Sequence, residues 1–250
     1  MENLITNIYE VTQRDEIVII LFKSDVFELL CNRSNSESLF EILNNLKRNH
    51  NIKALLFTNK PGCLGDEIYD KFLKKIMFEE TISNYAETLN FAERKIRIKE
   101  ITILNRFVKY IKEYNKLTFT ALTGSIVTPF FGLTMATDIR YLTPEAHFSL
   151  AHNKHGLHPS GGLPYFLGNQ LGQNKAIELL FSKKVTAAEA LELGLINKVI
   201  KEDNFLDNVV NEIKMITRFN ESVLNSTKTL TSNTMDTLSN YFDFEETYKP

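Results

Sequence analysis

The sequence predicts an α/β fold with a helical extension at its C-terminus. Residues 17–22 and 52–57 are short apolar runs typical of buried strands, and a helical pattern lies between them. This strand, helix, strand order is that of a βαβ unit, for which a right-handed crossover is expected. Strand-like runs recur along the chain at 117–122, 138–142 and 195–200. From about residue 204 the pattern is that of two helices.

The first elements follow from local signals. Residues 5–11 and 17–22 are rich in β-branched and aromatic side chains, and a short polar stretch between them predicts a hairpin. A helix follows, ending at about Arg48, with Ser36 or Ser38 as its expected N-cap.

Later elements are marked by helical periodicity and capping residues. Residues 66 to about 115 read as mostly helical and strongly charged, and 130–136 as a short buried helix. Thr186 and Glu189 have the spacing of a capping box, and Gly194 has the position of a helix end. Without an internal linker, we expect a core at 1–200 and an extension at 201–250.

Composition excludes several classes of protein. The chain has 250 residues, 43% apolar and 24% charged, which is ordinary for a globular protein that buries a sizeable core. A formal charge of −2 argues against a nucleic-acid partner. No apolar run approaches the roughly 20 residues that span a bilayer, and the N-terminus lacks the pattern of a signal peptide. We therefore expect a cytoplasmic protein without membrane contact.

An ordered set of motifs carries a resemblance to a known family. The motifs are Ala121-Leu-Thr-Gly124, Asp138-Ile-Arg140, Phe148, Gly156, Pro159, Gly162, Leu171-Gly172, Ala176, Thr186-Ala-Ala-Glu-Ala190, Gly194-Leu-Ile-Asn-Lys-Val199 and, upstream, Gly65-Asp-Glu-Ile68. Together they resemble the crotonase (enoyl-CoA hydratase/isomerase) family from residue 5 to about residue 200.

The resemblance implies a fold, an assembly and a ligand. Crotonases stack repeated ββα units into a spiral and assemble as homotrimers or dimers of trimers. They bind an acyl thioester, carried by CoA or a carrier protein, and use no cofactor besides the CoA of the substrate. Two backbone N–H groups hold the thioester oxygen and stabilise the enolate that forms there, an arrangement that is often the largest catalytic contribution.

The two N–H donors are assigned by the same resemblance. We expect the N–H of Asp66 to be the first, since Gly65 allows an unusual backbone conformation before a helix start. The second falls on Pro129, which has no N–H. Either the amide of Phe130 takes its place or the site has one donor. The expected substrate-binding residues are Leu64, Gly65, Pro129, Gly132 and His158.

The acid/base positions depart from the family pattern. The usual glutamates correspond to Gly132 and His152, so ordinary enoyl-CoA hydration is not expected. Four of the five histidines lie between His147 and His158, and histidine suits proton transfer near neutral pH. We expect His152 and then His155 to be catalytic, and His147 to be structural. Solvated loop histidines are the alternative.

No metal site is expected. The two HxxH spacings, His152 to His155 and His155 to His158, lie on a loop with no nearby Cys or carboxylate in the sequence. Cys31 and Cys63 form no CxxC pattern.

Two functions remain open at this point. The first is an enzyme that acts on an acyl thioester through an enolate, in an isomerisation, decarboxylation, C–C hydrolysis or specialised hydration. The second is a non-catalytic thioester-binding or structural subunit of the same fold.

Overall fold

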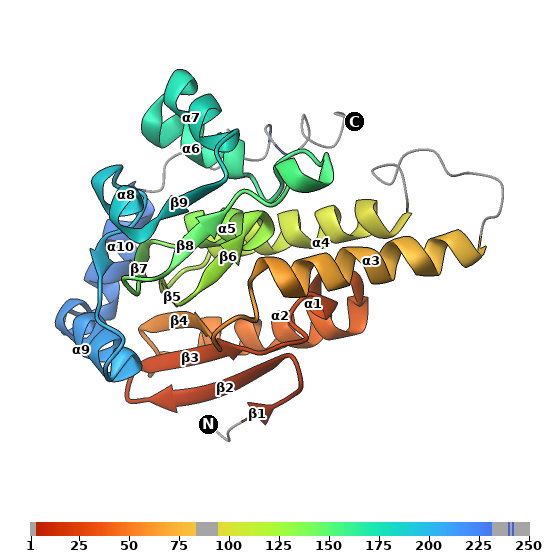
Figure 1. Cartoon of the computed structure of the whole chain (residues 1–250). Helices are drawn as coiled ribbons and strands as arrows, with labels where there is room; N and C mark the ends of the chain where they lie inside the picture. The colour runs from red at the N-terminus through yellow and green to blue at the C-terminus, as the bar shows by residue number, and fades with distance from the viewer. Residues whose placement is uncertain (1–3, 84–94, 232–239, 241, 243–250) are drawn as a thin grey trace.

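The computed structural model describes residues 4–83, 95–231, 240 and 242. A large sheet and a small sheet form the body, with helices on both sides of the large one (Figure 1). This architecture confirms the predicted α/β fold. Within the described residues, no helix has both the length and the apolar content needed to cross a membrane.

The large sheet is antiparallel at one edge and parallel elsewhere. Its seven strands lie in the order β1 (Leu4–Ile5), β2 (Tyr9–Arg14), β3 (Ile17–Phe22), β4 (Ala54–Asn59), β5 (Leu117–Leu122), β7 (Ile139–Leu142) and β10 (Lys198–Val199). β2 and β3 pair antiparallel, which confirms the predicted hairpin, and the strands from β3 onward run parallel.

The small sheet gives the chain its spiral path. It consists of β6 (Ser125–Val127), β8 (His147–Ser149) and β9 (Lys184–Thr186), in that order. Each of β5 and β7 is followed by a strand of the small sheet and then by helix, after which the chain returns to the large sheet. Repeated ββα units of this kind are the predicted arrangement.

Ten α-helices and one short 3-10 helix are seen in the described residues. They are α1 (Glu28–Cys31), α2 (Arg33–Arg48), α3 (Asp66–Ser83), α4 (Lys95–Lys112), α5 (Thr128–Met135), η2 (Asn153–His155), α6 (Leu163–Leu171), α7 (Gln173–Leu180), α8 (Ala187–Glu192), α9 (Phe205–Thr217) and α10 (Glu221–Thr231).

Two helix starts differ from the prediction. α2 is capped by Asn32, whose side chain accepts hydrogen bonds from two backbone N–H groups, so Ser36 and Ser38 lie inside the helix. α5 starts at Thr128, two residues earlier than predicted, because Pro129 fits the first turn, where its missing N–H removes no helical bond. The capping box of Thr186 and Glu189 is confirmed.

The large sheet is buried on both faces. Alternate residues of β3 face opposite ways: Val18 and Ile20 join the core beneath α1 to α8, whereas Ile17 and Ile19 join a second cluster with α9. α9 thus covers the outer face of the sheet. The boundary between core and extension stays a prediction.

Candidate functional site

The N-termini of α3 and α5 lie side by side. The N–H of Val127, which precedes α5, donates to the carbonyl of Leu64, which precedes α3, over 3.0 Å. Asp66 is the first residue of α3, so its N–H has no carbonyl of the same helix to bond to. The starts of the two helices therefore lie in direct contact.

The side chain of Asp66 holds this junction together. Its carboxylate accepts hydrogen bonds from Ser125 Oγ at 2.7 Å and from Ser149 Oγ at 2.6 Å. Ser125 lies on β6 and Ser149 on β8, so the carboxylate ties α3 to the small sheet. The predicted role of Asp66 as a backbone donor stays a prediction, but its side chain is engaged in structure.

Gly65 lies close to neighbouring segments and does not have the unusual backbone conformation that was expected. The glycine with a left-handed backbone in this loop is Gly62, with φ of 82°, whereas Gly65 has no positive φ. A Cβ on Gly65 would lie 3.2 Å from the carbonyl oxygen of Gly62 and 3.5 Å from Cβ of Ser125. The position is a close approach of chain segments, so the expectation of an unusual conformation is wrong.

At the start of α5, Pro129 and Phe130 both lie in the first turn. Both residues are buried. Pro129 can donate nothing, while the N–H of Phe130 lies too early in α5 to have an i−4 partner within the helix. The role of the Phe130 N–H as the second donor stays a prediction.

Gly132 is packed against backbone. A Cβ at this position would lie 2.4 Å from the carbonyl oxygen of Gly161 and 2.9 Å from that of Ser160. The turn that leads into α6 thus fills the space that a side chain at 132 would need. No acid/base group can stand here without movement of the main chain.

His152 lies buried beside the start of α5. It is 3% exposed, and its Nδ1 is 2.8 Å from Oγ1 of Thr128, the first residue of that helix. The Thr128 hydroxyl also lies 3.4 Å from the carbonyl oxygen of Ser149. A hydroxyl has one proton, so it either donates to Nδ1 or donates to Ser149 and accepts from Nδ1–H. Both arrangements fix the plane of the imidazole.

His155 faces α3 rather than His152. Its Nε2 lies 2.8 Å from Oδ1 of Asp70, which is also paired with Lys154. Lys154, with His155 as a second partner, holds the pKa of Asp70 below its usual value. This cluster ties the loop that carries His152 to α3, so the structure gives His155 an ion-pair role and does not bring it to Thr128.

The other two histidines of the cluster, His147 and His158, are both partly buried. His147 lies on β8 opposite Ser125 and lines a surface groove, and His158 is partly buried after η2. Among the described residues, no three His, Cys, Asp or Glu side chains converge into a metal-binding group.

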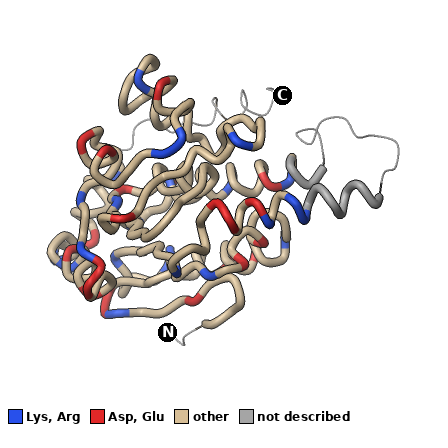
Figure 2. Tube along the Cα trace, viewed as in Figure 1, with Lys and Arg blue, Asp and Glu red and all other residues tan. Residues whose placement is uncertain are grey.

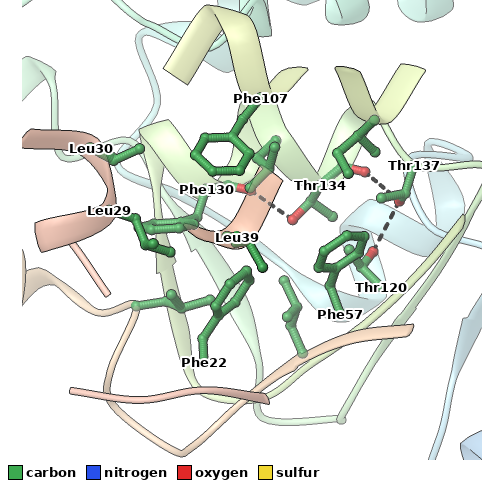
Figure 3. A pocket seen from close by; sticks show the side chains of 14 residues that line it. Phe22, Leu29, Leu30, Leu39, Phe57, Phe107, Thr120, Phe130, Thr134 and Thr137 are labelled. Atoms are coloured by element: carbon green, nitrogen blue, oxygen red, sulfur yellow. Dashed lines mark hydrogen bonds between the residues drawn. The ribbon is translucent and has the colours of Figure 1, made fainter. Parts of the chain in front are cut away.

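An apolar cavity lies under the two helix starts. Its volume is about 30 Å³, and Leu64 and Phe130 are among its walls (Figure 3). Figure 3 shows Leu29, Leu30 and Phe130 on one side, and Thr120, Thr134 and Thr137 together with Phe57 on the other. The ring of Phe130 meets that of Phe27 edge-on, with centroids 5.1 Å apart.

A larger open groove lies on the other side of the same loop. It has a volume of about 810 Å³ and is lined by Lys23, Lys60, Gly62, Asp66 and His147, among others. Its lining combines the cations Lys23 and Lys60 with the carboxylates of Asp25, Asp66 and Glu67. Acidic and basic residues are likewise interspersed along the whole described chain (Figure 2). The segment from residue 63 to residue 66 thus separates a polar groove from an apolar cavity.

The sequence did not reveal the residues whose side chains bond to Asp66, His152 and His155. Thr128, Ser125, Ser149 and Asp70 each touch a predicted site residue across 20 residues or more of sequence. None of them carries a local motif, so only the folded chain reveals them.

Comparison with known proteins decides the family. A family model described as Enoyl-CoA hydratase/isomerase matches residues 87–248, more than half of the chain. The chain belongs to the enoyl-CoA hydratase/isomerase family. The crotonase resemblance of the sequence is thereby confirmed.

Solved structures agree with this fold. The chain is similar to an enoyl-CoA hydratase from Bacillus halodurans, with 20% identity, a TM-score of 0.77 and coverage of 95% of this chain and 92% of that one. It is also similar to an enoyl-CoA hydratase from Bacillus anthracis, with 17% identity and a TM-score of 0.74. That match covers 96% of this chain and 90% of the other. At such identities the likeness shows the enoyl-CoA hydratase/isomerase fold alone.

Proposed function

We propose that this chain binds an acyl thioester of CoA or of an acyl carrier and acts on it through an enolate. The carbonyl oxygen would lie between the N-termini of α3 and α5. The observation that carries the proposal is the hydrogen bond from Val127 N–H to the Leu64 carbonyl, 3.0 Å long, which brings the two helix starts together. Preformed N–H donors of this kind stabilise an oxyanion without reorganisation.

The surroundings of the junction suit a thioester. Such a molecule has a polar carrier arm, a carbonyl and an apolar acyl group in sequence. The groove with Lys23 and Lys60 would take the arm, and the cavity behind Leu64 would take the acyl group. The carbonyl would then fall at the segment that separates them, beside Asp66 N–H and Phe130 N–H.

His152 is the acid/base group of the proposed reaction. It would move a proton at the α-carbon of the bound acyl group, with its ring held by Thr128. Standard hydration requires two groups around one water, and Gly132 supplies no second one. An isomerisation, decarboxylation, C–C hydrolysis or specialised hydration is proposed in its place, with no cofactor besides CoA.

Proton exchange tests the enolate. In D₂O, the α-protons of acetyl- or butyryl-CoA should exchange faster with the protein than without it, as followed by proton NMR. His152→Gln should remove the acceleration while binding of the thioester persists. His50→Gln is the matched control, because His50 is exposed and pairs with Glu221, far from the site in sequence and fold. Exchange that His152→Gln leaves unchanged would exclude His152 as the base.

A non-catalytic binder is the second candidate. Two observations favour it: backbone fills the space beside Gly132, and Pro129 occupies a position where a donor is expected. This candidate predicts tight binding of an acyl-CoA with no accelerated α-proton exchange. The same NMR experiment therefore separates the two candidates.

We further propose a homotrimer or a dimer of trimers in the cytoplasm. Exposed apolar side chains lie on α7 (Ile177, 47% exposed), directly after it (Phe181, 79%) and on α8 (Leu191, 43%), and others lie on or next to α9 and α10 (Met215, Phe219, Val223 and Leu230). Such side chains are more common at interfaces between subunits than on free surfaces. Light scattering of the purified protein should give three or six copies of the chain, and a monomer would contradict the proposal.

A further inference from the structure

The apolar cavity has walls that restrict what can fill it. None of its described lining residues is charged, and its aromatic walls are Phe22, Phe57, Phe107 and Phe130. In Figure 3 the rings of Phe107 and Phe22 lie on opposite sides of the cavity. Phe107 is itself held in place, because its ring stacks on Phe40 with centroids 4.2 Å apart.

The threonines of the cavity offer no free proton. Thr134 donates to the carbonyl of Phe130 over 2.7 Å, and Thr137 donates to the carbonyl of Thr134 over 2.7 Å. Thr120 Oγ1 lies 3.3 Å from Thr137 Oγ1. The only hydroxyl proton of Thr137 is already donated to the Thr134 carbonyl, so Thr120 is the donor in this pair. A hydroxyl or carboxylate on a bound acyl group would therefore meet no hydrogen-bond donor from this row.

The volume sets a limit on length. About 10–15 Å³ of such space holds one water-sized group. The cavity of about 30 Å³ thus has room for about two or three such groups. A longer hydrocarbon would need the rings at its walls to move.

From these observations we infer that the site is specific for short acyl groups without a polar substituent, with two or three carbons beyond the thioester carbonyl. Of the proposed reactions this selects isomerisation, because a decarboxylation starts from a carboxylate, C–C hydrolysis from a second carbonyl, and a hydration ends on a hydroxyl. Phe107 is the residue that limits length. The inference rests on the proposed function, because it assigns the cavity to the acyl group. Phe107 comes from α4, which carries none of the proposed thioester-binding residues, so it can be changed without altering them.

Calorimetry with a series of saturated acyl-CoAs tests this specificity. From acetyl- to butyryl-CoA, affinity should rise roughly fourfold per carbon, since each buried methylene contributes ~0.8 kcal/mol. From hexanoyl-CoA onward it should stop rising or fall. Succinyl- and 3-hydroxybutyryl-CoA should bind at least tenfold more weakly than butyryl-CoA, as a buried polar group without a donor costs more than ~1.4 kcal/mol.

Phe107→Leu should extend the rise in affinity to hexanoyl- and octanoyl-CoA. Phe119→Leu is the matched control, because Phe119 is also fully buried but packs on the other face of the sheet with Tyr141. It should leave the length limit unchanged. If Phe107→Leu does not fold, the acyl-CoA series with the unaltered protein still tests the limit on acyl length.

The outcomes distinguish a failure of the short-acyl specificity from a failure of the proposed thioester binding. Affinity that rises steadily through octanoyl-CoA, or succinyl-CoA that binds as tightly as butyryl-CoA, would overturn the specificity and leave thioester binding intact. Failure of every acyl-CoA to bind would overturn the proposed function, and the inference with it.

Discussion

A Cβ on Gly132 would lie only 2.4 Å from the carbonyl oxygen of Gly161. α5 and the turn before α6 can approach this closely because residue 132 has no side chain. The contact is between main-chain atoms, so no rotamer change can relieve a clash here. A glutamate at this position, which the family resemblance leads one to expect, is incompatible with the present fold.

Gly132→Ala should therefore destabilise the protein markedly. Overpacking of a buried site costs about 1–3 kcal/mol, and backbone on the other side argues for the upper end. Urea denaturation measures the change. Gly168→Ala is the matched control, because Gly168 lies within α6 with nothing within 4 Å of a new Cβ. That change should stabilise the helix by about 0.5–1 kcal/mol. Equal effects of the two substitutions would contradict the close approach.

Asp66→Ala should also lower the free energy of unfolding. The two serine hydroxyls that donate to Asp66 lose their charged acceptor, and bonds to charged groups contribute about 1.5–3 kcal/mol each. Glu67→Ala removes an equal charge from the same first turn of α3, but from a side chain that is 82% exposed. The difference between the two variants thus isolates the hydroxyl bonds from the helix dipole. A difference near zero would show that the bonds contribute nothing.

The pair of Lys116 and Glu221 should make stability depend on pH. Lys116 is buried, with its Nζ 2.9 Å from Oε1 of Glu221, and this hydrogen bond lowers the pKa of Glu221. The folded pKa thus lies below the unfolded one. The stabilisation is fully present above the ordinary glutamate pKa of about 4.3, and it is lost as the pH falls through the folded pKa.

Glu221→Gln should cost about 3 kcal/mol at pH 7, since it leaves a buried ammonium without its counter-charge. The gap to the unaltered protein should narrow as the pH falls below about 4.3. Glu178→Gln, at an ion pair whose carboxylate side chain is 70% exposed, should change stability by less than about 0.5 kcal/mol. Denaturation curves from pH 3 to pH 7 measure the free energy of unfolding of each variant. A difference between Glu221→Gln and the unaltered protein that does not depend on pH would contradict the ion pair.

Thr128 should act through His152. Thr128→Val removes the hydroxyl at nearly constant volume, so the imidazole loses the partner of its Nδ1. Acceleration of α-proton exchange should fall about tenfold or more, out of the ~100- to 10,000-fold that acid/base groups contribute. Affinity for butyryl-CoA should hardly change, and Thr128→Ser should restore the rate. A rate that Thr128→Val leaves intact would mean that the contact is only structural.

Local features of this chain could be predicted from its sequence, and non-local ones could not. The strand Leu117–Leu122 and the capping box at Thr186 follow from residues within a few positions of one another, and both are confirmed. The contact of Gly132 with Gly161 depends on how two helices cross, which no short pattern encodes. Gly65 shows the same limit. The sequence shows that a glycine is present, but it does not show whether the glycine serves a positive φ or a close approach of another chain segment.

The polarisation of a bound thioester carbonyl tests the central claim most directly. Isotope-edited infrared difference spectra, with butyryl-CoA labelled with ¹³C at the carbonyl, report on hydrogen bonds to that oxygen alone. If the N–H groups at the starts of α3 and α5 hold the oxygen, the C=O stretch should move to clearly lower frequency on binding than it has in water. A bound thioester whose stretch stays at or above its value in water would contradict the oxyanion site.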